Sequence, residues 1–520
     1  MKPMRPYLYF TVFSSGMAVL AIELSAARLI GSVFGSSNLV WASIIGLILI
    51  YLTIGYFVGG WWADRSPYYR TLYQILAWGA FFAGIVPFVA RPVLTLAANA
   101  FDELQVGVLL GSFFAVLVLF IIPVTLLGMT SPFAIRLAII NPQEAGSVSG
   151  KVYAISTLGS FVGTFLPVLL LIPLVGTTLT FAIFSLYLLI IAIIGLWLDS
   201  GWKVALRLAW MPILLLAAVF LNRNASIKKT AGQIYESESA YNYIQVLERD
   251  GYRLLRLNEG QGIHSIWHPT DLDFEGPWKQ FLAAPFFNSP EYTMANVKNM
   301  AIIGLAAGTT ARQASAVYGP IPIDGYELDP QIIEIGKEFF ELDAANIQPI
   351  AQDGRWGLSQ SDQAYSVIAI DAYRPPYIPW HLTTREFFKI VYDQLLDDGV
   401  MVINVGRSPT DRRLIDGLAS TINSIFPSVY VVDIPYTFNS IIYATKQETS
   451  IDNFYENLVY FYTQPDVNPL LINAMEVVVM NLRPTPVGSY IFTDDWAPIE
   501  YITNNMVLSF LLSDDMETLR

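Results

Sequence analysis

The sequence contains no cysteine and only three histidines, at His264, His268 and His381. Without thiols the chain can form no disulfide framework, no thiolate nucleophile and no cysteine-ligated metal site. His264 and His268 stand four residues apart, but no acidic or cysteine partner completes a zinc pattern with them. We therefore expect no metal.

Charged residues are also scarce, at 14% of the 520 residues, whereas apolar residues make up 54%. A soluble domain usually carries about 25% charged residues, so part of this chain is expected to lie in lipid. The formal net charge is −13. Nucleic-acid binding needs a basic surface, and we expect no nucleic-acid partner.

The first part of the chain consists of long apolar runs. A helix needs about 20 apolar residues to cross a bilayer, and seven stretches meet this length: 7–27, 38–62, 72–98, 106–130, 152–175, 177–199 and 204–221. We predict a transmembrane helical domain over residues 1–222 with membrane lipid around it, and a loop over 131–150.

Basic residues predict how this domain is oriented, because cytoplasmic loops are rich in lysine and arginine. They precede the first span and follow the second, fourth and sixth spans, at Lys2, Arg5, Arg65, Arg70, Arg136, Lys151, Lys203 and Arg207. The N-terminus is therefore predicted to be cytoplasmic. Seven crossings would then place the C-terminal domain outside the cytoplasm.

One carboxylate, Glu23, falls inside the first predicted span. An ionisable group in lipid is costly and is by default a functional candidate. Its natural partner is Arg28, five residues further on. A structural ion pair at the edge of the bundle and a binding or transport role for Glu23 both remain open.

The composition changes after Lys229. Residues 241–268 alternate apolar and polar positions around Asp250-Gly251, a pair typical of a hairpin turn. We predict a small antiparallel β subdomain over residues 230–295, ending in a helix at 277–287.

From Asn299 the pattern becomes strand, loop and helix, repeated several times. This alternation predicts a parallel, doubly wound sheet over residues 296–450. Residues 451–520 contain many aromatic residues and are predicted to form a C-terminal extension that packs on the α/β domain.

Four positions at the ends of successive predicted strands are glycine or acidic: Gly304, Glu327, Asp353 and Asp371. Ligands of such sheets bind at the carboxyl ends of the strands. A glycine turn from Gly304 to Gly308 would let a ligand approach the backbone, and an acid after the second strand can accept both hydroxyls of a ribose. Asp353 could accept from the exocyclic amine of adenine, and Asp371 stands where a reacting group would lie.

Each acid taken alone is more simply explained as a solvated loop carboxylate or a helix cap. Their joint placement favours a nucleoside site.

Several ordered segments resemble the spermidine synthases. They are ESESAYNYIQV (236–246), the GLAAGTT turn, YELDP (326–330), QDGRWGL (352–358) and DAYRPPYIPWHLTTREFF (371–388). The apolar half resembles the transmembrane region fused to such domains in a bacterial family, in IELSAARLIGSVFGSSNLVWASIIG (22–46), GYFVGGWWADR (55–65), LLGMTSPFAIRLAI (126–139) and SGKVYAISTLGSFVGT (149–164).

This resemblance implies a Rossmann-like methyltransferase/spermidine synthase fold that binds decarboxylated S-adenosylmethionine and a polyamine. It implies that Glu327 holds the ribose, that Asp353 holds the adenine, and that Asp371 helps to deprotonate the attacking amine. Asn242 stands where the family usually has a glutamine near the nucleoside.

The sequence departs from the family at three positions. Ala307 replaces an aspartate of the glycine turn that, in the family, binds the cationic aminopropyl chain of the donor. Arg374 replaces a second acid near Asp371, and Lys279 stands where an acid is expected. Cationic substrates need paired carboxylates, so these changes oppose polyamine binding.

Three functions therefore stay open. The first is a membrane-anchored transferase that uses a nucleoside of the S-adenosylmethionine type and an amine or other acceptor. The second is a catalytically degenerate structural or assembly module, within a homo-oligomer or a larger membrane assembly. The third is a transporter or sensor, which the lack of an evident internal repeat disfavours.

Overall fold

The structure is a computed structural model that describes residues 4–34, 38–103, 107–222, 230–258, 262–373, 378–408, 411–486, 488 and 490–512. It contains two compact units. The first comprises Met1–Thr230 with the short segments Glu236–Tyr243 and Asn258–Gly260, and the second comprises Ala231–Tyr235, Ile244–Leu257 and Gln261–Arg520.

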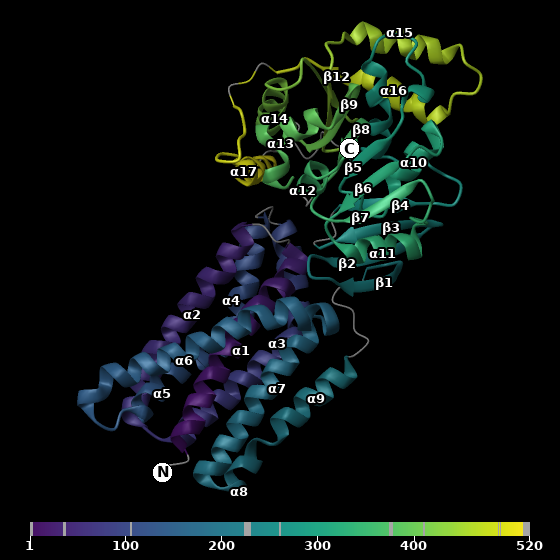
Figure 1. Cartoon of the computed structure of the whole chain (residues 1–520). Coiled ribbons are helices and arrows are strands. Elements are labelled where there is room, and N and C mark those ends of the chain that lie inside the picture. Colours follow the sequence, from purple (N-terminus) through teal and green to yellow (C-terminus); the bar gives the residue numbers. More distant parts are fainter. Residues whose placement is uncertain are drawn as a thin grey trace. The chain divides into compact units, whose positions relative to one another are not determined.

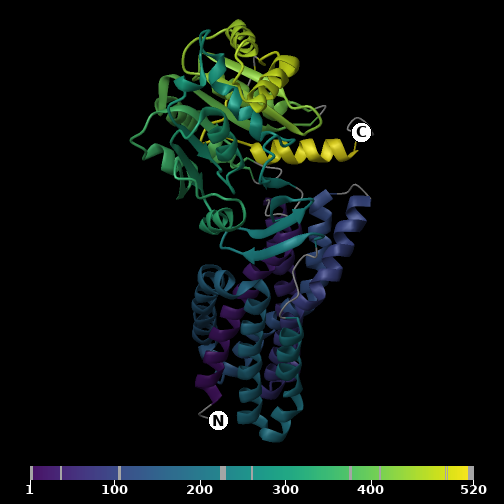
Figure 2. The same ribbon diagram turned by 90° about the vertical axis from the view of Figure 1, so that its right-hand side faces the viewer.

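The first unit is built from helices that run alongside one another (Figures 1 and 2). They are α1 (Met4–Phe34), α2 (Asn38–Arg65), α3 (Tyr69–Glu103), α4 (Gly107–Gly128), α5 (Thr130–Ala138), α6 (Ala145–Leu166), α7 (Ile172–Ser200), α8 (Trp202–Ala205) and α9 (Trp210–Leu221).

Within the described residues, six helices are long and apolar enough to cross a membrane: Met4–Phe34, Val40–Arg65, Tyr69–Ala90, Gly111–Ala138, Pro142–Ser200 and Trp202–Leu221. The count is six rather than the predicted seven because Pro142–Ser200 forms one helical stretch of 59 residues. A straight helix of that length would measure about 90 Å, roughly three times the hydrocarbon core of a bilayer. Its backbone breaks at Gly176 (φ 80°, ψ 169°), between the two predicted spans 152–175 and 177–199.

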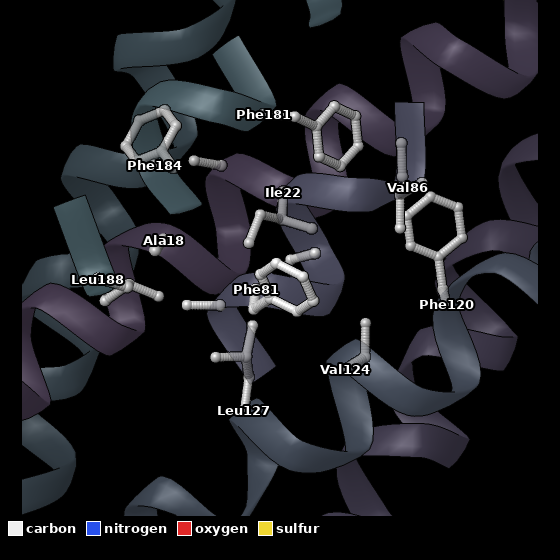
Figure 3. Close-up of a cluster of buried hydrophobic side chains, with 14 of the residues drawn as sticks. Ala18, Ile22, Phe81, Val86, Phe120, Val124, Leu127, Phe181, Phe184 and Leu188 are labelled. Carbon is white, nitrogen blue, oxygen red and sulfur yellow. The ribbon is translucent and has the colours of Figure 1, made fainter. Parts of the chain in front are cut away.

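Glycines allow α1 and α6 to pack closely. A Cβ atom on Gly159 would lie 2.0 Å from the Phe13 carbonyl oxygen, and one on Gly163 would lie 2.0 Å from that of Met17. Only glycine permits this approach, as in the pairs of small residues that let membrane helices pack closely. Figure 3 shows part of the apolar core between α1, α3, α4 and α7, with Ile22, Phe81 and Phe181 among its side chains.

The predicted loop over residues 131–150 is wrong. Thr130–Ala138 forms α5, and α6 already begins at Ala145. Only a short connection containing the 3₁₀ turn Pro142–Glu144 separates them. Glycine and serine, which suggested a loop, are tolerated in apolar helices where neighbouring helices approach closely.

A small antiparallel sheet has the strand order β1-β2-β3-β4. Its strands are β1 (Gln233–Glu238), β2 (Tyr243–Arg249), β3 (Tyr252–Leu257) and β4 (Ile263–Trp267). Asp250 and Gly251 both have positive φ angles, of 52° and 84°, and join β2 to β3 by a two-residue turn. This confirms the predicted hairpin. The segment Trp278–Phe287 is a 3₁₀ helix that contains Pro285.

The main sheet of the second unit has eight strands in the order β12-β10-β11-β9-β8-β5-β6-β7 (Figure 1). Strands β5 to β9 are parallel, and β10, β11 and β12 add antiparallel pairs at one side. The bounds are β5 (Met300–Ile303), β6 (Ile323–Glu327), β7 (Ile347–Ala351), β8 (Tyr365–Ile370), β9 (Leu395–Gly406), β10 (Ser428–Asp433), β11 (Asn439–Thr445) and β12 (Leu482–Arg483). The predicted doubly wound, Rossmann-like fold is confirmed.

Both edges of this sheet are irregular. The edge strand β7 contains Pro349, which has no backbone N–H to donate. The opposite edge strand β12 is only two residues long.

Helices cover the faces of the sheet: α10 (Thr309–Tyr318), α11 (Pro330–Phe339), α12 (Gly354–Ser359), α13 (Arg385–Asp393), α14 (Arg413–Asn423), α15 (Ile451–Tyr462), α16 (Pro469–Asn481) and α17 (Ile499–Leu512). Helix α15 buries Phe454, Leu458 and Phe461 in the core of the unit.

Candidate functional site

The turn after β5 is determined by two glycines. Gly304 and Gly308 have φ angles of 85° and 89°, in the left-handed region that residues with side chains rarely adopt. A Cβ atom on Gly304 would lie 2.6 Å from the backbone nitrogen of Ala372, so the turn lies directly against the segment that follows β8. The backbone of the glycine turn and the end of β8 are therefore in contact.

The end of β5, at Ile303 and Gly304, contacts the segments that carry all three predicted acids. Its carbonyl oxygen accepts from the Asp371 backbone nitrogen at 2.8 Å. A Cβ atom on Gly354, next to Asp353, would lie 2.4 Å from Ile303 Cγ2. The next residue, Gly304, donates its N–H to the carbonyl of Tyr326, which directly precedes Glu327. The fold thus brings these acidic residues to one edge of the sheet.

The Glu327 carboxylate is oriented by backbone amides. Its Oε2 accepts from Ala306 N at 3.0 Å, and its Oε1 accepts from Asp329 N at 3.1 Å. Burial raises the pKa of Glu327 to about 7, against the opposing effect of these two amides. No arginine or lysine of the described chain forms an ion pair with it. A half-buried acid held without a cation can accept hydrogen bonds from a ligand.

Asp353 is a helix cap, as the alternative interpretation of a single acid predicted. Its Oδ1 accepts from Trp356 N at 2.9 Å at the start of α12, and its Oδ2 lies 3.0 Å from His381 Nε2. The hydrogen bond with His381 holds the pKa of Asp353 below its usual value. A carboxylate oxygen has two lone pairs, so capping leaves Asp353 able to accept one further hydrogen bond.

Asp371 is held by a chain of two side-chain amides. Asn404 Nδ2 donates to Asp371 Oδ1 at 2.9 Å, and Asn439 Nδ2 donates to Asn404 Oδ1 at 2.8 Å. Burial raises the pKa of Asp371 to about 7, and the bond from Asn404 opposes this shift. A carboxylate with this pKa can accept a proton near neutral pH.

Sequence reasoning did not identify Asn404 and Asn439. The available signal was an asparagine within the apolar strand MVINVG (401–406), at the end of the strand beside that of Asp371.

The three departures from the resemblance have different surroundings. Ala307 is buried among Ile332, Ile335 and Phe340, and its N–H donates to Ser265 Oγ at 2.9 Å. Lys279 forms an ion pair with Asp273, so its charge is neutralised locally. Arg374 lies outside the described residues.

The remaining candidates belong to the first unit. Asn242 Oδ1 accepts from Asn258 Nδ2 at 2.9 Å. Arg28 donates to the carbonyl oxygens of Ser239 and Tyr241. Glu23 forms no hydrogen bond or ion pair within the described part of the chain, so there it is not paired with Arg28, and the choice between a structural and a binding role stays open. The partners of Arg28 lie more than 200 positions further along the sequence, which local spacing cannot indicate.

No group of three or more histidine, aspartate or glutamate side chains in the described ranges could hold a metal ion. His268 Nδ1 instead accepts from the backbone nitrogen of Asp271 at 3.0 Å. Burial lowers the pKa of His264 to about 4.

The family comparison matches part of the second unit. Residues 285–456 match the family described as "Spermine/spermidine synthase domain". A "Probable polyamine aminopropyl transferase" of Bifidobacterium longum is 32% identical over 282 residues, which cover 52% of this chain and 61% of the relative. The match thus spans less than two thirds of that relative.

A "Polyamine aminopropyltransferase" of Vibrio vulnificus is 27% identical over 39% of this chain and 68% of its own length. Among solved structures, a probable spermidine synthase from Corynebacterium glutamicum is 21% identical, with a TM-score of 0.38 over 43% of this chain and 82% of that one.

Proposed function

We propose that the spermine/spermidine synthase domain of this chain binds a nucleoside of the S-adenosylmethionine series, with decarboxylated S-adenosylmethionine as the first candidate. The observation that supports this proposal is that Glu327, Asp353 and Asp371 each lie at or just after the carboxyl end of β6, β7 or β8, at the edge of the sheet where β5 ends in the glycine turn. Glu327 accepts from the ribose hydroxyls, and Asp353 accepts from the exocyclic amine of adenine. The glycine turn from Gly304 to Gly308 gives the ligand access to the backbone.

The proposed chemistry is transfer of a group from the sulfur of the nucleoside to a nucleophilic acceptor. An acceptor amine beside Asp371 attacks the carbon next to sulfur, so that a C–N bond forms while the C–S bond breaks. The thioether nucleoside leaves, and the amine proton passes to the Asp371 carboxylate. The raised pKa of Asp371 suits it to this role.

The acceptor differs from an ordinary polyamine in this proposal. A polyamine needs carboxylates around its ammonium groups, yet Arg374 stands where the resemblance implies a second acid near Asp371. The acceptor is therefore an amine of lower charge or another nucleophile. The relatives named polyamine aminopropyltransferases support an amine.

Titration calorimetry of the full-length protein in nanodiscs tests nucleoside binding, with methylthioadenosine and decarboxylated S-adenosylmethionine as ligands. Binding of either is expected, and no binding to either would contradict the proposal. Where turnover is detected, Asp371→Asn should abolish most of it while nucleoside binding persists. Turnover that survived this change would remove Asp371 from catalysis.

A second candidate function is a structural or assembly module without catalysis. Ala307 favours a non-catalytic module. It is buried in an apolar cluster, where the resemblance implies an aspartate that binds the donor's cationic chain. Failure of both nucleosides to bind would favour this function.

We also propose that the N-terminus is cytoplasmic and that the α/β unit lies outside the cytoplasm. The support is the distribution of lysine and arginine among the loops, together with seven crossings when Pro142–Ser200 is counted as two spans separated by the break at Gly176. Alkaline phosphatase fused after Arg520 should then be active, and a fluorescent protein fused there by the same linker should be dark. The reverse result would place the domain in the cytoplasm.

A further inference from the structure

The Asp353 carboxylate is held at both of its oxygens. Its Oδ1 accepts from Trp356 N at 2.9 Å, and its Oδ2 lies 3.0 Å from His381 Nε2. An ionised carboxylate can only accept, so the proton of the second bond is assigned to His381 Nε2. Two bonds at different oxygens stop the carboxylate from turning. His381 therefore helps to determine the directions in which Asp353 can accept a further hydrogen bond.

His381 is itself held by the helix that Asp353 caps. Arg355, in the first turn of α12, donates from Nη1 to the carbonyl oxygen of His381 at 3.0 Å. Asp353 thus caps the helix that carries Arg355, Arg355 holds the backbone of His381, and the imidazole returns to Asp353. These contacts form a closed circuit, so that a displacement of Arg355 reaches Asp353 through His381.

A residue near the end of the chain holds this circuit in place. Arg355 Nη1 and Nη2 donate to Asp494 Oδ1 and Oδ2, both at 2.7 Å. Two parallel bonds between a guanidinium and a carboxylate fix direction as well as distance. Thr384, which caps α13 directly after the turn containing His381, also donates from Oγ1 to Asp494 Oδ1 at 2.7 Å. Asp494 therefore contacts both sides of the circuit.

The segment that carries Asp494 is fixed to the core of the second unit. Phe492 is fully buried, and its carbonyl oxygen accepts from Arg385 N at 2.8 Å. Asp494 N donates to Glu386 Oε2 at 3.0 Å. Exposed ion pairs often contribute little, because ordering two long side chains costs entropy. Here the backbone of Asp494 is already ordered, so the pair can hold Arg355 in place.

We propose that His381, Arg355 and Asp494 are positioning residues that select the base of the nucleoside by orienting Asp353. This inference rests on the proposed nucleoside binding, in which Asp353 accepts from the exocyclic amine of adenine. Hydrogen bonds weaken steeply when they are misaligned, so the orientation of the carboxylate decides how strongly the amine is preferred. The C-terminal segment is then part of the nucleoside site, although Asp494 lies 139 positions beyond Arg355.

Titration calorimetry of the full-length protein in nanodiscs tests this role by the ratio of the Kd of methylthioinosine to that of methylthioadenosine. His381→Ala should reduce this ratio about fivefold, the effect of one hydrogen bond of ordinary strength. Arg355→Ala and Asp494→Ala act less directly, and each should reduce it about threefold. Their combination should have no more effect than the larger single change, because both remove the same pair.

Two matched variants serve as controls. His268→Ala removes another histidine of the second unit, whose Nδ1 accepts from Asp271 N. Lys389→Ala removes a cation of α13 that pairs with Asp393. Both should leave the ratio of the two Kd values unchanged.

Conservative variants separate lost positioning from misfolding. His381→Gln keeps a side-chain donor for Asp353, and Asp494→Asn keeps an acceptor for Arg355. Each should restore most of the ratio that the corresponding alanine variant loses. A ratio that stayed low in both conservative variants would contradict the positioning role.

The outcomes distinguish failure of this inference from failure of the proposed function. A ratio that falls in Asp353→Ala but is unchanged in His381→Ala, Arg355→Ala and Asp494→Ala would overturn the inference alone. Equal weakening of both nucleosides in these three variants would also overturn it, because the contacts would then only stabilise the fold. Failure of the unaltered protein to bind either nucleoside would reject the proposed function, and the positioning role with it.

Discussion

The two halves of the sheet edge hold their acids by different means. Beside β5 and β6, Glu327 is oriented by the backbone amides of Ala306 and Asp329. Beside β8, β9 and β11, Asp371 is oriented by the side chains of Asn404 and Asn439. Apart from a change to proline, substitution leaves a backbone N–H in place, whereas it can remove a side-chain amide.

This difference indicates which half of the sheet edge can change as related sequences diverge. The geometry around Glu327 follows from the glycine turn and persists as long as the turn folds. The geometry around Asp371 depends on individual side chains, and these can be exchanged without disturbing the sheet. Nucleoside binding is therefore expected to be the more robust property, and the choice of acceptor the more variable one.

The largest effect is expected from Glu327→Ala. Loss of two hydrogen bonds between a carboxylate and ribose hydroxyls, worth about 3 kcal/mol together, should weaken methylthioadenosine binding about a hundredfold. Calorimetry of the full-length protein measures this change. The control is Glu334→Ala on α11, which removes an exposed acid that pairs with Lys337. This variant should bind methylthioadenosine with unchanged affinity. Equal affinities in the two variants would remove Glu327 from the site.

A smaller and more selective effect is expected from Asp353→Ala. The unaltered protein should prefer methylthioadenosine to methylthioinosine, which lacks the exocyclic amine. In the variant the ratio of the two Kd values should be about tenfold smaller. Ser450→Ala removes the cap of α15 in the same way, so it controls for the stability cost of losing a cap, about 1 kcal/mol. A preference that survives in Asp353→Ala would leave this residue with a capping role alone.

The smallest effect concerns pH. Burial favours the protonated forms of Glu327 and Asp371, so their contribution to stability is present below their unfolded pKa values, near 4. It is lost as pH rises through about 7. Thermal unfolding should therefore show lower stability at pH 8 than at pH 6.

Nucleoside affinity should change with pH in the opposite sense. In the proposed site the ribose hydroxyls bind the ionised carboxylate of Glu327, so affinity should rise over this range by less than about tenfold per pH unit. Glu327→Gln should remove this dependence of affinity, whereas Asp371→Asn should leave it. The reverse pattern would assign nucleoside binding to the other half of the edge.

Positions fixed by local chemistry could be predicted from the sequence. The Asp250-Gly251 turn requires two positive φ angles, and this dipeptide tolerates them. The strand ends at Gly304, Glu327 and Asp371 follow from short apolar runs that stop at a glycine or an acid. Parallel pairing then brings such ends to one edge, so the location of the candidate site could be derived.

Contacts between distant segments could not be predicted in this way. Spacing suggested Arg28 for Glu23, but the arginine contacts Ser239 and Tyr241. Asn404 was missed because a single asparagine in an apolar strand has no local pattern. A helix was predicted at 277–287, but its 3₁₀ form was not, because tertiary packing selects that form.

The edges of the eight-stranded sheet matter for a domain tethered to a membrane, where neighbouring copies are crowded together. An open edge strand can recruit a strand from another chain and so begin aggregation. Pro349 removes a hydrogen-bond donor from β7, and β12 offers only two residues. Neither border is a good template for a further strand, so the domain can be kept at high local density without polymerising through its sheet.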